Sequence, residues 1–320
     1  MIEFTSRNAR AWSRLGSCGA FGLAAVDVAE NNDKIVMLTA DLTFFSGLER
    51  FKNAFPDRLY NCGIAEQNMI GVAAGMAKEG FIPFANTYGT FASMRCADQV
   101  RVNMGYMNLP IKLVGLTSGL SVGILGPTHI STEDIAVFRS IPNIDILSPA
   151  DCMETIKAVQ AAAKTDRPTY IRLTGTTSNP AVYKEDYEFE IGKAIRLKEG
   201  DDVTIIATGT MVHMALQVAE KMQEFGVSVE VIDMHTIKPL DEEAILGASG
   251  KAIVTLEEHS IIGGLGSAVN DCLINAGNKK SCLNLGLSDE YKHAADYTYL
   301  LSSYGLDVDT ITNKIRLFLN

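Results

Sequence analysis

Short apolar runs alternate along this chain with longer stretches in which apolar positions recur at helical spacing. The run KIVMLTADL at 34–42 ends in a polar Thr-Ala-Asp tip, and IKLVGLTSGL at 111–120 and PTYIRLTG at 168–175 repeat that form. Between them lie helical stretches such as SPADCMETIKAVQAAAK, which begins with Ser148, Pro149 and a carboxylate, all of them helix start signals. This alternation predicts an α/β fold with mainly parallel strands.

The pattern is interrupted near residues 176–190. There, TTSNPAVYKEDYEFE is polar, contains a proline and has neither period, which is typical of a link between domains. The alternation then resumes with DVTIIATGT, MVHMALQVAEKMQEFG and KAIVTLEEHS. We therefore predict two doubly wound α/β domains, at 1–178 and 191–320, joined by a linker at 179–190.

Composition narrows the classes of function. The chain has 320 residues, 47% of them hydrophobic, which is enough to bury about two cores. Its net charge of -10 argues against a general nucleic-acid or anionic-membrane surface. No apolar stretch reaches the ~20 residues that span a bilayer, and the N-terminus has no signal-peptide pattern, so we expect a cytoplasmic protein. The six cysteines include no CxxC pair, which is typical of reduced thiols.

The segment RLYNCGIAEQNMIGVAAGMAKEGFIPF at 58–84 contains the first candidate site residue. A strand-like start ends at Gly63-Ile64, and a helix rich in glycine and alanine begins at Glu66. A carboxylate in the first turn commonly does no more than complement the helix macrodipole, which stabilises by ~0.3–1 kcal/mol. Each glycine inside a helix, however, costs up to ~1 kcal/mol relative to alanine. We expect a close contact with another backbone or a flat ligand to offset that cost.

Two further segments contain candidate residues. Tyr88 and Phe91 are three residues apart; such a pair is usually core, but an exposed pair can stack on a planar ring. The glycine-rich stretch SGLSVGILGPTH ends at His129 and matches neither GxxxxGK[ST] nor GxGxxG after a strand, so no nucleotide-binding fold is supported. The other four histidines show no metal-binding spacing, and there is no GxSxG elbow of a serine hydrolase. The sequence thus predicts no metal ligand in this chain.

In this order the segments resemble the transketolase family of thiamine-diphosphate enzymes. TADLT, GIAEQNMIGVAAGMAKEGFIPF, GPTHISTEDIAVFRSIPNIDILSPAD and PTYIRL are similar to its pyrimidine-binding domain. IIATGTMVHMALQVAEKM, VIDMHTIKPLD and EEHSIIGGLGSAV are similar to its smaller C-terminal domain. The resemblance covers nearly the whole chain but only the C-terminal half of a full-length transketolase.

The half without a counterpart carries the GDG-type motif that holds Mg²⁺ and the diphosphate in this family. The resemblance therefore implies one subunit of a split enzyme that is active only with a partner. That partner is the diphosphate-binding subunit, which holds the diphosphate of thiamine diphosphate and most of the Mg²⁺ contacts, so the cofactor lies between the two subunits. It also implies a heterotetramer, with self-association through the pyrimidine-binding and C-terminal domains.

By motif position the resemblance implies roles for individual residues. Glu66 corresponds to the glutamate that hydrogen-bonds N1′ of the cofactor's aminopyrimidine and favours the imino tautomer, which takes the proton from the thiazolium carbon. Phe91, and more loosely Tyr88, correspond to residues that stack on the pyrimidine ring, and Asp41 lies in the cofactor-binding TADLT segment. His129 corresponds to a histidine near the substrate hydroxyl or carbonyl.

The substrate positions depart from the family pattern. Transketolases usually read GEDGPTH or GADGPTH, whereas this chain reads GILGPTH, with Leu125 in place of the aspartate. A histidine expected earlier falls near Thr117 and Ser118, and the phosphate-binding serine after ADLT falls on Phe44 and Phe45. The arginine expected after PTYIRL is also missing. A site without these polar groups favours a substrate that is less phosphorylated or less hydroxylated than an ordinary phosphosugar.

The leading hypothesis is a transketolase-like transferase that moves a two-carbon ketol, or a related acyl unit, between sugar-like ketose and aldose substrates. One alternative is the beta subunit of a 2-oxo acid dehydrogenase or acetoin-cleaving enzyme, which MHTIKPLD also fits, although GPTHISTEDIAVFRSIPN is more transketolase-like. Another is a non-catalytic regulatory paralogue, against which the retained Glu66 counts. The donor, the acceptor, the phosphorylation of the substrates and the pathway stay open at this point.

Overall fold

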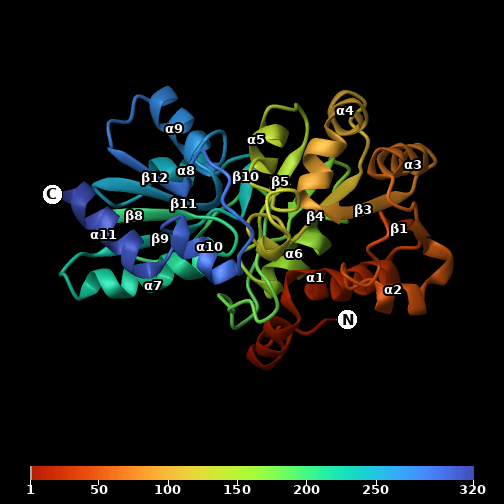
Figure 1. The fold of residues 1–320 in the computed structure, drawn as a ribbon, viewed down its shortest axis with the longest axis horizontal. Coiled ribbons are helices and arrows are strands. Elements are labelled where there is room, and N and C mark those ends of the chain that lie inside the picture. The colour runs from red at the N-terminus through yellow and green to blue at the C-terminus, as the bar shows by residue number, and fades with distance from the viewer. Residues whose placement is uncertain (1) are drawn as a thin grey trace.

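The computed structural model describes residues 2–320, which form two α/β units lying side by side (Figure 1). The first sheet consists of β1 (Ile35–Thr39), β2 (Leu59–Asn61), β3 (Ile82–Tyr88), β4 (Lys112–Leu116), β5 (Asp145–Leu147), β6 (Thr169–Arg172) and β10 (Thr236–Lys238). The second consists of β7 (Ile195–Lys198), β8 (Val203–Ala207), β9 (Val229–Asp233), β11 (Ala252–Ser260) and β12 (Cys282–Leu287). The α-helices are α1 (Ser6–Asn31), α2 (Glu49–Ala54), α3 (Glu66–Lys78), α4 (Ala97–Val100), α5 (Asp134–Arg139), α6 (Cys152–Ala162), α7 (Met211–Gln223), α8 (Glu242–Leu246), α9 (Leu265–Asn275), α10 (Tyr297–Ser303) and α11 (Val308–Leu319).

The strand order confirms the predicted α/β class with two doubly wound domains. The seven-stranded sheet has the order β10-β5-β6-β4-β3-β1-β2, and the five-stranded sheet has the order β12-β11-β8-β9-β7. Neighbouring strands are parallel except for the pairs β10/β5 and β7/β9. Parallel strands need crossover connections, which the helices between them supply.

Both faces of each sheet are covered, as the apolar runs require. On β1, Ile35 and Met37 belong to the core that also contains side chains of α1 and α6, whereas Val36 and Leu38 belong to the core of α3. Successive side chains of a strand point to opposite faces. A strand buried on both faces therefore reads as a continuous apolar run, with no polar alternation.

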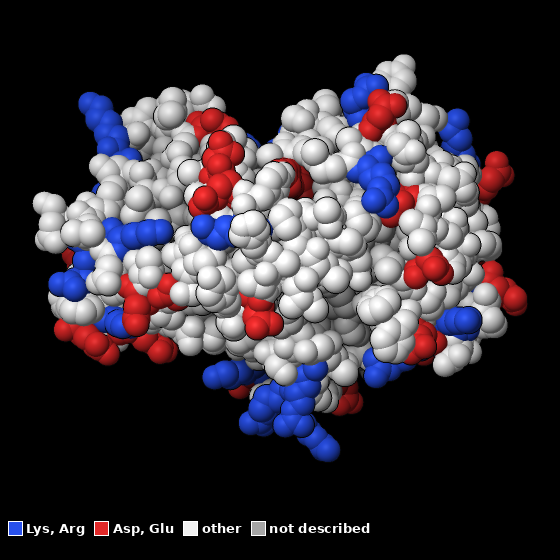
Figure 2. All heavy atoms as spheres, viewed as in Figure 1, with Lys and Arg blue, Asp and Glu red and all other residues white. Residues whose placement is uncertain are grey.

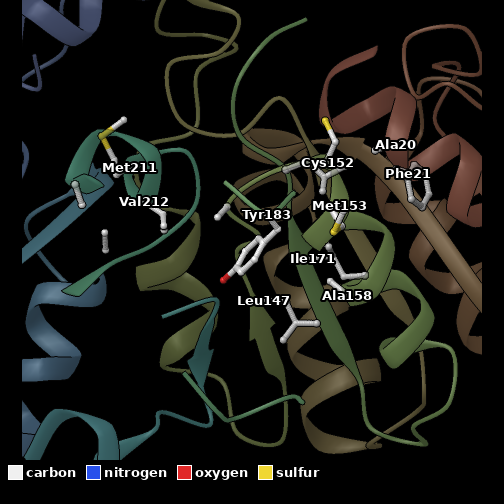
Figure 3. Close-up of a cluster of buried hydrophobic side chains, with 14 of the residues drawn as sticks. Ala20, Phe21, Leu147, Cys152, Met153, Ala158, Ile171, Tyr183, Met211 and Val212 are labelled. Atoms are coloured by element: carbon white, nitrogen blue, oxygen red, sulfur yellow. The ribbon is translucent and has the colours of Figure 1, made fainter. Parts of the chain in front are cut away.

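The junction between the two units is closely packed. Tyr183, from the stretch 173–194 that forms neither helix nor strand, lies between Met211 and Val212 of α7 and the core beneath β5 and β6 (Figure 3). This stretch contains the predicted linker at 179–190. The exact division into domains stays a prediction.

One strand does not follow the predicted division. β10 falls in the range assigned to the second domain, yet it pairs antiparallel with β5, placing Thr236 opposite Leu147 in the first sheet. A three-residue strand has too few ladder bonds to hold a position by itself, so packing between the units decides which sheet it joins. The two units are thus connected by backbone hydrogen bonds as well as by side chains.

The visible surface carries charges of both signs. Acidic and basic side chains are interspersed around the edges of this face, whose middle is largely uncharged, and a dense group of basic side chains lies at its lower edge, where α1 begins (Figure 2). This face therefore shows no broad field of one sign. Within residues 2–320 no helix is both long enough and apolar enough to cross a bilayer.

Candidate active site

The predicted site residues gather at the carboxyl ends of parallel strands in the first sheet. Asp41 follows β1, Glu66 comes shortly after β2, Tyr88 ends β3 and Thr117 follows β4. β1 lies between β2 and β3 in the sheet. The strand that follows β1 in the chain is therefore on one side of it, and the next strand is on the other side, which makes β1 a topological switch point. In open α/β sheets, ligands bind outside the carboxyl ends of strands at such a switch point.

Glu66 is the first residue of α3, as predicted, and only 3% of its surface is exposed. Its Oε1 accepts a hydrogen bond from Arg95 Nη1 at 2.7 Å. Within residues 2–320 its Oε2 accepts none, so that oxygen is available to a ligand. The carboxylate borders a surface hollow of about 350 Å³. The other residues lining this hollow are Ile64, Ala65, Gln67, Asn68 and Arg95.

Arg95 is a site residue that the sequence analysis did not single out. Its guanidinium lies 3.9 Å from the centroid of the Phe91 ring and also holds Glu66. Phe91–Arg95 forms a π-helical turn, a feature frequent at functional sites. The only signal in the sequence is the four-residue spacing between Phe91 and Arg95, which brings two side chains together on a helix. Arg95 therefore connects the carboxylate to the aromatic ring.

Three predicted residues form an aromatic cluster. The ring of His129 lies 5.3 Å from that of Phe91 and 6.0 Å from that of Tyr88, both edge-on, and the rings of Tyr88 and Phe91 are 5.9 Å apart. All three side chains are half-buried. Burial raises the pKa of Tyr88, so its phenol is neutral at pH 7. The structure thus brings together residues from β3, the following turn and a loop about 40 positions further along the chain.

Asp41 lies on the β2 side of this edge. Its backbone has a φ of 60°, and its N–H donates to Asn61 Oδ1 at 3.1 Å, while Asn61 Nδ2 donates back to Asp41 Oδ1 at 3.0 Å. These bonds join the ends of β1 and β2. A contact between Asp41 and a cofactor stays a prediction.

The loop that follows β4, residues 117–133, is called the substrate loop below. Thr117 at its start has a φ of 47°, and Leu125 is 46% exposed. Ser118 is fully buried, and its hydroxyl donates to the Gly115 carbonyl at 3.1 Å. Ser118 therefore connects the start of the loop to the end of β4 and does not reach the surface. Of the predicted residues of this loop, Leu125 is exposed, Thr117 and His129 are half-buried, and Ser118 is buried.

No three His, Cys, Asp or Glu side chains within residues 2–320 gather closely enough to hold a metal ion.

Comparisons with known proteins agree on one family. The models for the transketolase pyrimidine-binding domain and the transketolase C-terminal domain match residues 17–178 and 192–311. A putative transketolase C-terminal section from Methanocaldococcus jannaschii is 39% identical over 92% of this chain and 93% of its own. The 6-deoxy-6-sulfo-D-fructose transketolase subunit SqwH from a Clostridium species is 41% identical over 89% of each chain. A solved split-gene transketolase, described as an inactive beta4 tetramer, has a TM-score of 0.86 and 38% identity, covering 95% of this chain and 97% of its own. The chain therefore belongs to the transketolase family.

Proposed function

We propose that this chain is one subunit of a two-chain transketolase-like enzyme that transfers a two-carbon ketol, or a related acyl unit, between sugar-like substrates. The observation that carries the proposal is the nearly buried Glu66 carboxylate, with one oxygen held by Arg95 and the other open to a hollow. A carboxylate kept out of water in this way is placed to exchange a proton with a bound ring. Relatives named as separate transketolase subunits or sections match almost the whole chain, which supports a partner subunit.

The side chains at the site fit the pyrimidine end of thiamine diphosphate. When bound, this cofactor supplies an electron sink for the carbanion of the transferred unit. Glu66 Oε2 would accept a hydrogen bond from a ring N–H, while Arg95 fixes the carboxylate in position. Phe91 and Tyr88 offer aromatic faces next to it for stacking. We propose that the partner subunit holds the diphosphate and Mg²⁺, because the family motif for them lies in the half that this chain does not match.

The accessible residues on the substrate side are largely apolar. Leu125 and its neighbour Ile124 are exposed, and Phe44 and Phe45 form an exposed edge-to-face pair after β1. His129 is the polar group that this chain would direct at a substrate oxygen. A site lined by these apolar side chains favours a donor that makes few charged or hydroxyl contacts. The name of the relative SqwH specifies a ketose with a charged sulfo group, which supports a sugar-like donor but not one without charge.

The test combines this chain with its diphosphate-binding partner, thiamine diphosphate and Mg²⁺. We expect ketol transfer from a ketose to an aldehyde acceptor, detected as a new ketose by NMR. Turnover of pyruvate without any ketose turnover would contradict the proposal and identify the chain as a subunit of a 2-oxo acid enzyme. A well-assembled complex that turns over neither class would favour a non-catalytic subunit.

A further inference from the structure

The substrate loop is attached to the C-terminal domain at both of its ends. Near its start, the backbone N–H of Leu120 donates to Glu258 Oε1 at 2.6 Å, across 138 positions of sequence. Near its end, the N–H of Ser260 donates to the Thr132 carbonyl at 2.8 Å. Glu258 and Ser260 both lie on β11. One strand of the C-terminal domain therefore holds both ends of the loop that carries Leu125 and His129.

The middle of the loop also contacts the C-terminal domain closely. The N–H of Ala295 donates to the Gly123 carbonyl at 3.1 Å, and a Cβ on Gly123 would lie 2.6 Å from the Ala295 carbonyl oxygen. A Cβ on Gly119 would lie 2.3 Å from Glu258 Oε1. Glycine is needed at both positions because any larger residue would push the loop away from the domain. The glycine-rich composition of this loop thus has a packing reason.

Glu258 itself is the best-connected group in this contact. It is 1% exposed, and besides Leu120 it accepts hydrogen bonds at Oε2 from Tyr297 at 2.6 Å and Thr210 at 2.8 Å. Burying a carboxyl group is costly unless donors converge on it, as they do here. Burial also raises the pKa of Glu258. A second buried link runs from Arg172, which donates to the carbonyls of Ser131 in the loop and Glu258 on β11.

We infer that Glu258 is a positioning residue, through which the C-terminal domain fixes the conformation of the substrate loop. Glu258 does not belong to the aromatic cluster and acts through the Leu120 backbone. The consequence for substrate binding rests on the proposed function, because Leu125 and His129 meet a substrate only if that function is correct. The consequence for the loop itself can be measured on the chain alone.

Three variants separate positioning from general stability. Glu258→Ala removes the acceptor of the Leu120 N–H, whereas Glu258→Gln keeps a carbonyl oxygen there. Tyr297→Phe removes one hydroxyl that orients the carboxylate and is the milder change. The matched control is Glu230→Ala, which removes another fully buried glutamate of the same domain. Glu230 accepts hydrogen bonds from Thr204 and Ser249 and forms an ion pair with Arg196, and all three partners lie outside the loop.

The first measurement is amide hydrogen exchange of the isolated chain, read by mass spectrometry. We expect exchange in residues 117–133 to rise about 10-fold in Glu258→Ala, as for one lost hydrogen bond to a charged group, and to stay near the wild-type rate in Glu258→Gln. If exchange in residues 117–133 stays at the wild-type rate in Glu258→Ala, or rises equally in the Glu230→Ala control, the inference is overturned. If Glu258→Ala does not fold, Tyr297→Phe decides the question by a rise of a few-fold confined to the loop.

The second measurement uses the complex with the partner subunit. We expect KM for the donor to rise about 10-fold in Glu258→Ala with kcat changed much less, and Glu258→Gln to restore KM. A loosened loop with an unchanged KM would overturn the positioning role. Because exchange needs no turnover, an inactive wild-type complex would contradict the proposed function alone, and the exchange result would still decide whether Glu258 holds the loop.

Discussion

At the scale of single residues, Glu66 has two competing explanations. A carboxylate at a helix start complements the helix macrodipole, but that effect needs neither burial nor an arginine partner, and Glu66 has both. If its free oxygen binds the cofactor ring, Glu66→Gln should keep the shape of the site and lower the rate by ~10²-fold or more. The measurement is hydrogen–deuterium exchange at the thiazolium carbon of the cofactor in the assembled complex, together with the melting temperature.

The control for this prediction is Glu49→Gln, which neutralises the exposed first-turn carboxylate of α2. It should change stability by no more than ~0.3–1 kcal/mol and leave the exchange rate unaltered. Wild-type exchange in Glu66→Gln, with only a slightly lower melting temperature, would reduce Glu66 to a residue that stabilises the helix.

Leu125 makes the second prediction at this scale. Its side chain is exposed in the substrate loop, where an aspartate is usual in the family. Leu125→Asp should shift the ranking of donors toward ketoses with a hydroxyl next to the transferred unit, measured as kcat/KM for each, because its carboxylate can accept a hydrogen bond from that hydroxyl. Ile124→Asp places the same charge one residue away and is the control. Equal rankings in the wild type and Leu125→Asp would refute the loop argument.

At the scale of elements, a buried acidic cluster joins α6, β9 and the stretch between the two sheets. The Tyr183 hydroxyl donates to Asp233 Oδ2 at 2.7 Å, and the Tyr187 hydroxyl donates to Glu154 Oε1 at 3.0 Å. The two tyrosine rings stack with their centroids 4.0 Å apart. Burial raises the pKa of Asp233 to about 7 and that of Glu154 well above its usual value. The folded chain therefore holds protons here that the unfolded chain has released.

This cluster predicts a pH dependence of stability. Between about pH 4, the ordinary carboxyl pKa, and pH 7, the folded state binds more protons than the unfolded state, so the free energy of unfolding should fall as pH rises. Asp233→Asn keeps an acceptor for Tyr183 and removes one titrating group. It should therefore make the decrease in the free energy of unfolding with pH smaller by about 1.4 kcal/mol per pH unit. Urea unfolding at pH 5, 6, 7 and 8 measures the slope. The exposed Asp57→Asn is the control, and an unchanged slope in Asp233→Asn would contradict the prediction.

At the scale of the whole molecule, one face of the small-residue helix α3 is left uncovered by the chain, while Met69, Ile70 and Ala73 on its other face are buried in the core. A Cβ on Gly71 or Gly75 of α3 would meet no atom within 4 Å. Ile64, just before α3, and Met94 and Tyr106, on two π-helical turns that contact α3, are strongly exposed. The cost of glycine in this helix is therefore not offset within the chain. We propose that α3 packs against another subunit in an assembly of two copies of this chain and two of the partner.

Gly71→Leu tests this assembly. The isolated chain should tolerate the change, because the position is open and leucine favours a helix over glycine. The variant should lose the heterotetramer, measured by light scattering of the co-purified subunits, with activity falling in parallel. A fully active 1:1 complex of the wild-type subunits would contradict the proposed assembly.

Much of the fold could be predicted from the sequence, because its signals are local. The strands at β1, β4 and β6 follow from apolar runs with polar tips, and the start of α3 at Glu66 follows from the change of period after Gly63. The aromatic pair of Tyr88 and Phe91 follows from a three-residue spacing. In each case the residues involved are within about ten positions of one another, so the chain's own geometry brings them together.

Tertiary structure alone decided the rest. Arg95 reaches Glu66 across 29 positions, β10 joins a sheet formed by the other half of the chain, and Ser118 is buried where an accessible substrate residue was expected. The bond from Leu120 to Glu258 spans 138 positions. Which distant groups meet depends on how two sheets and their helices pack, and a pattern along the sequence does not encode that distance. The sequence by itself determined the elements and the chemistry that they carry, and packing between the two domains determined how the site is held.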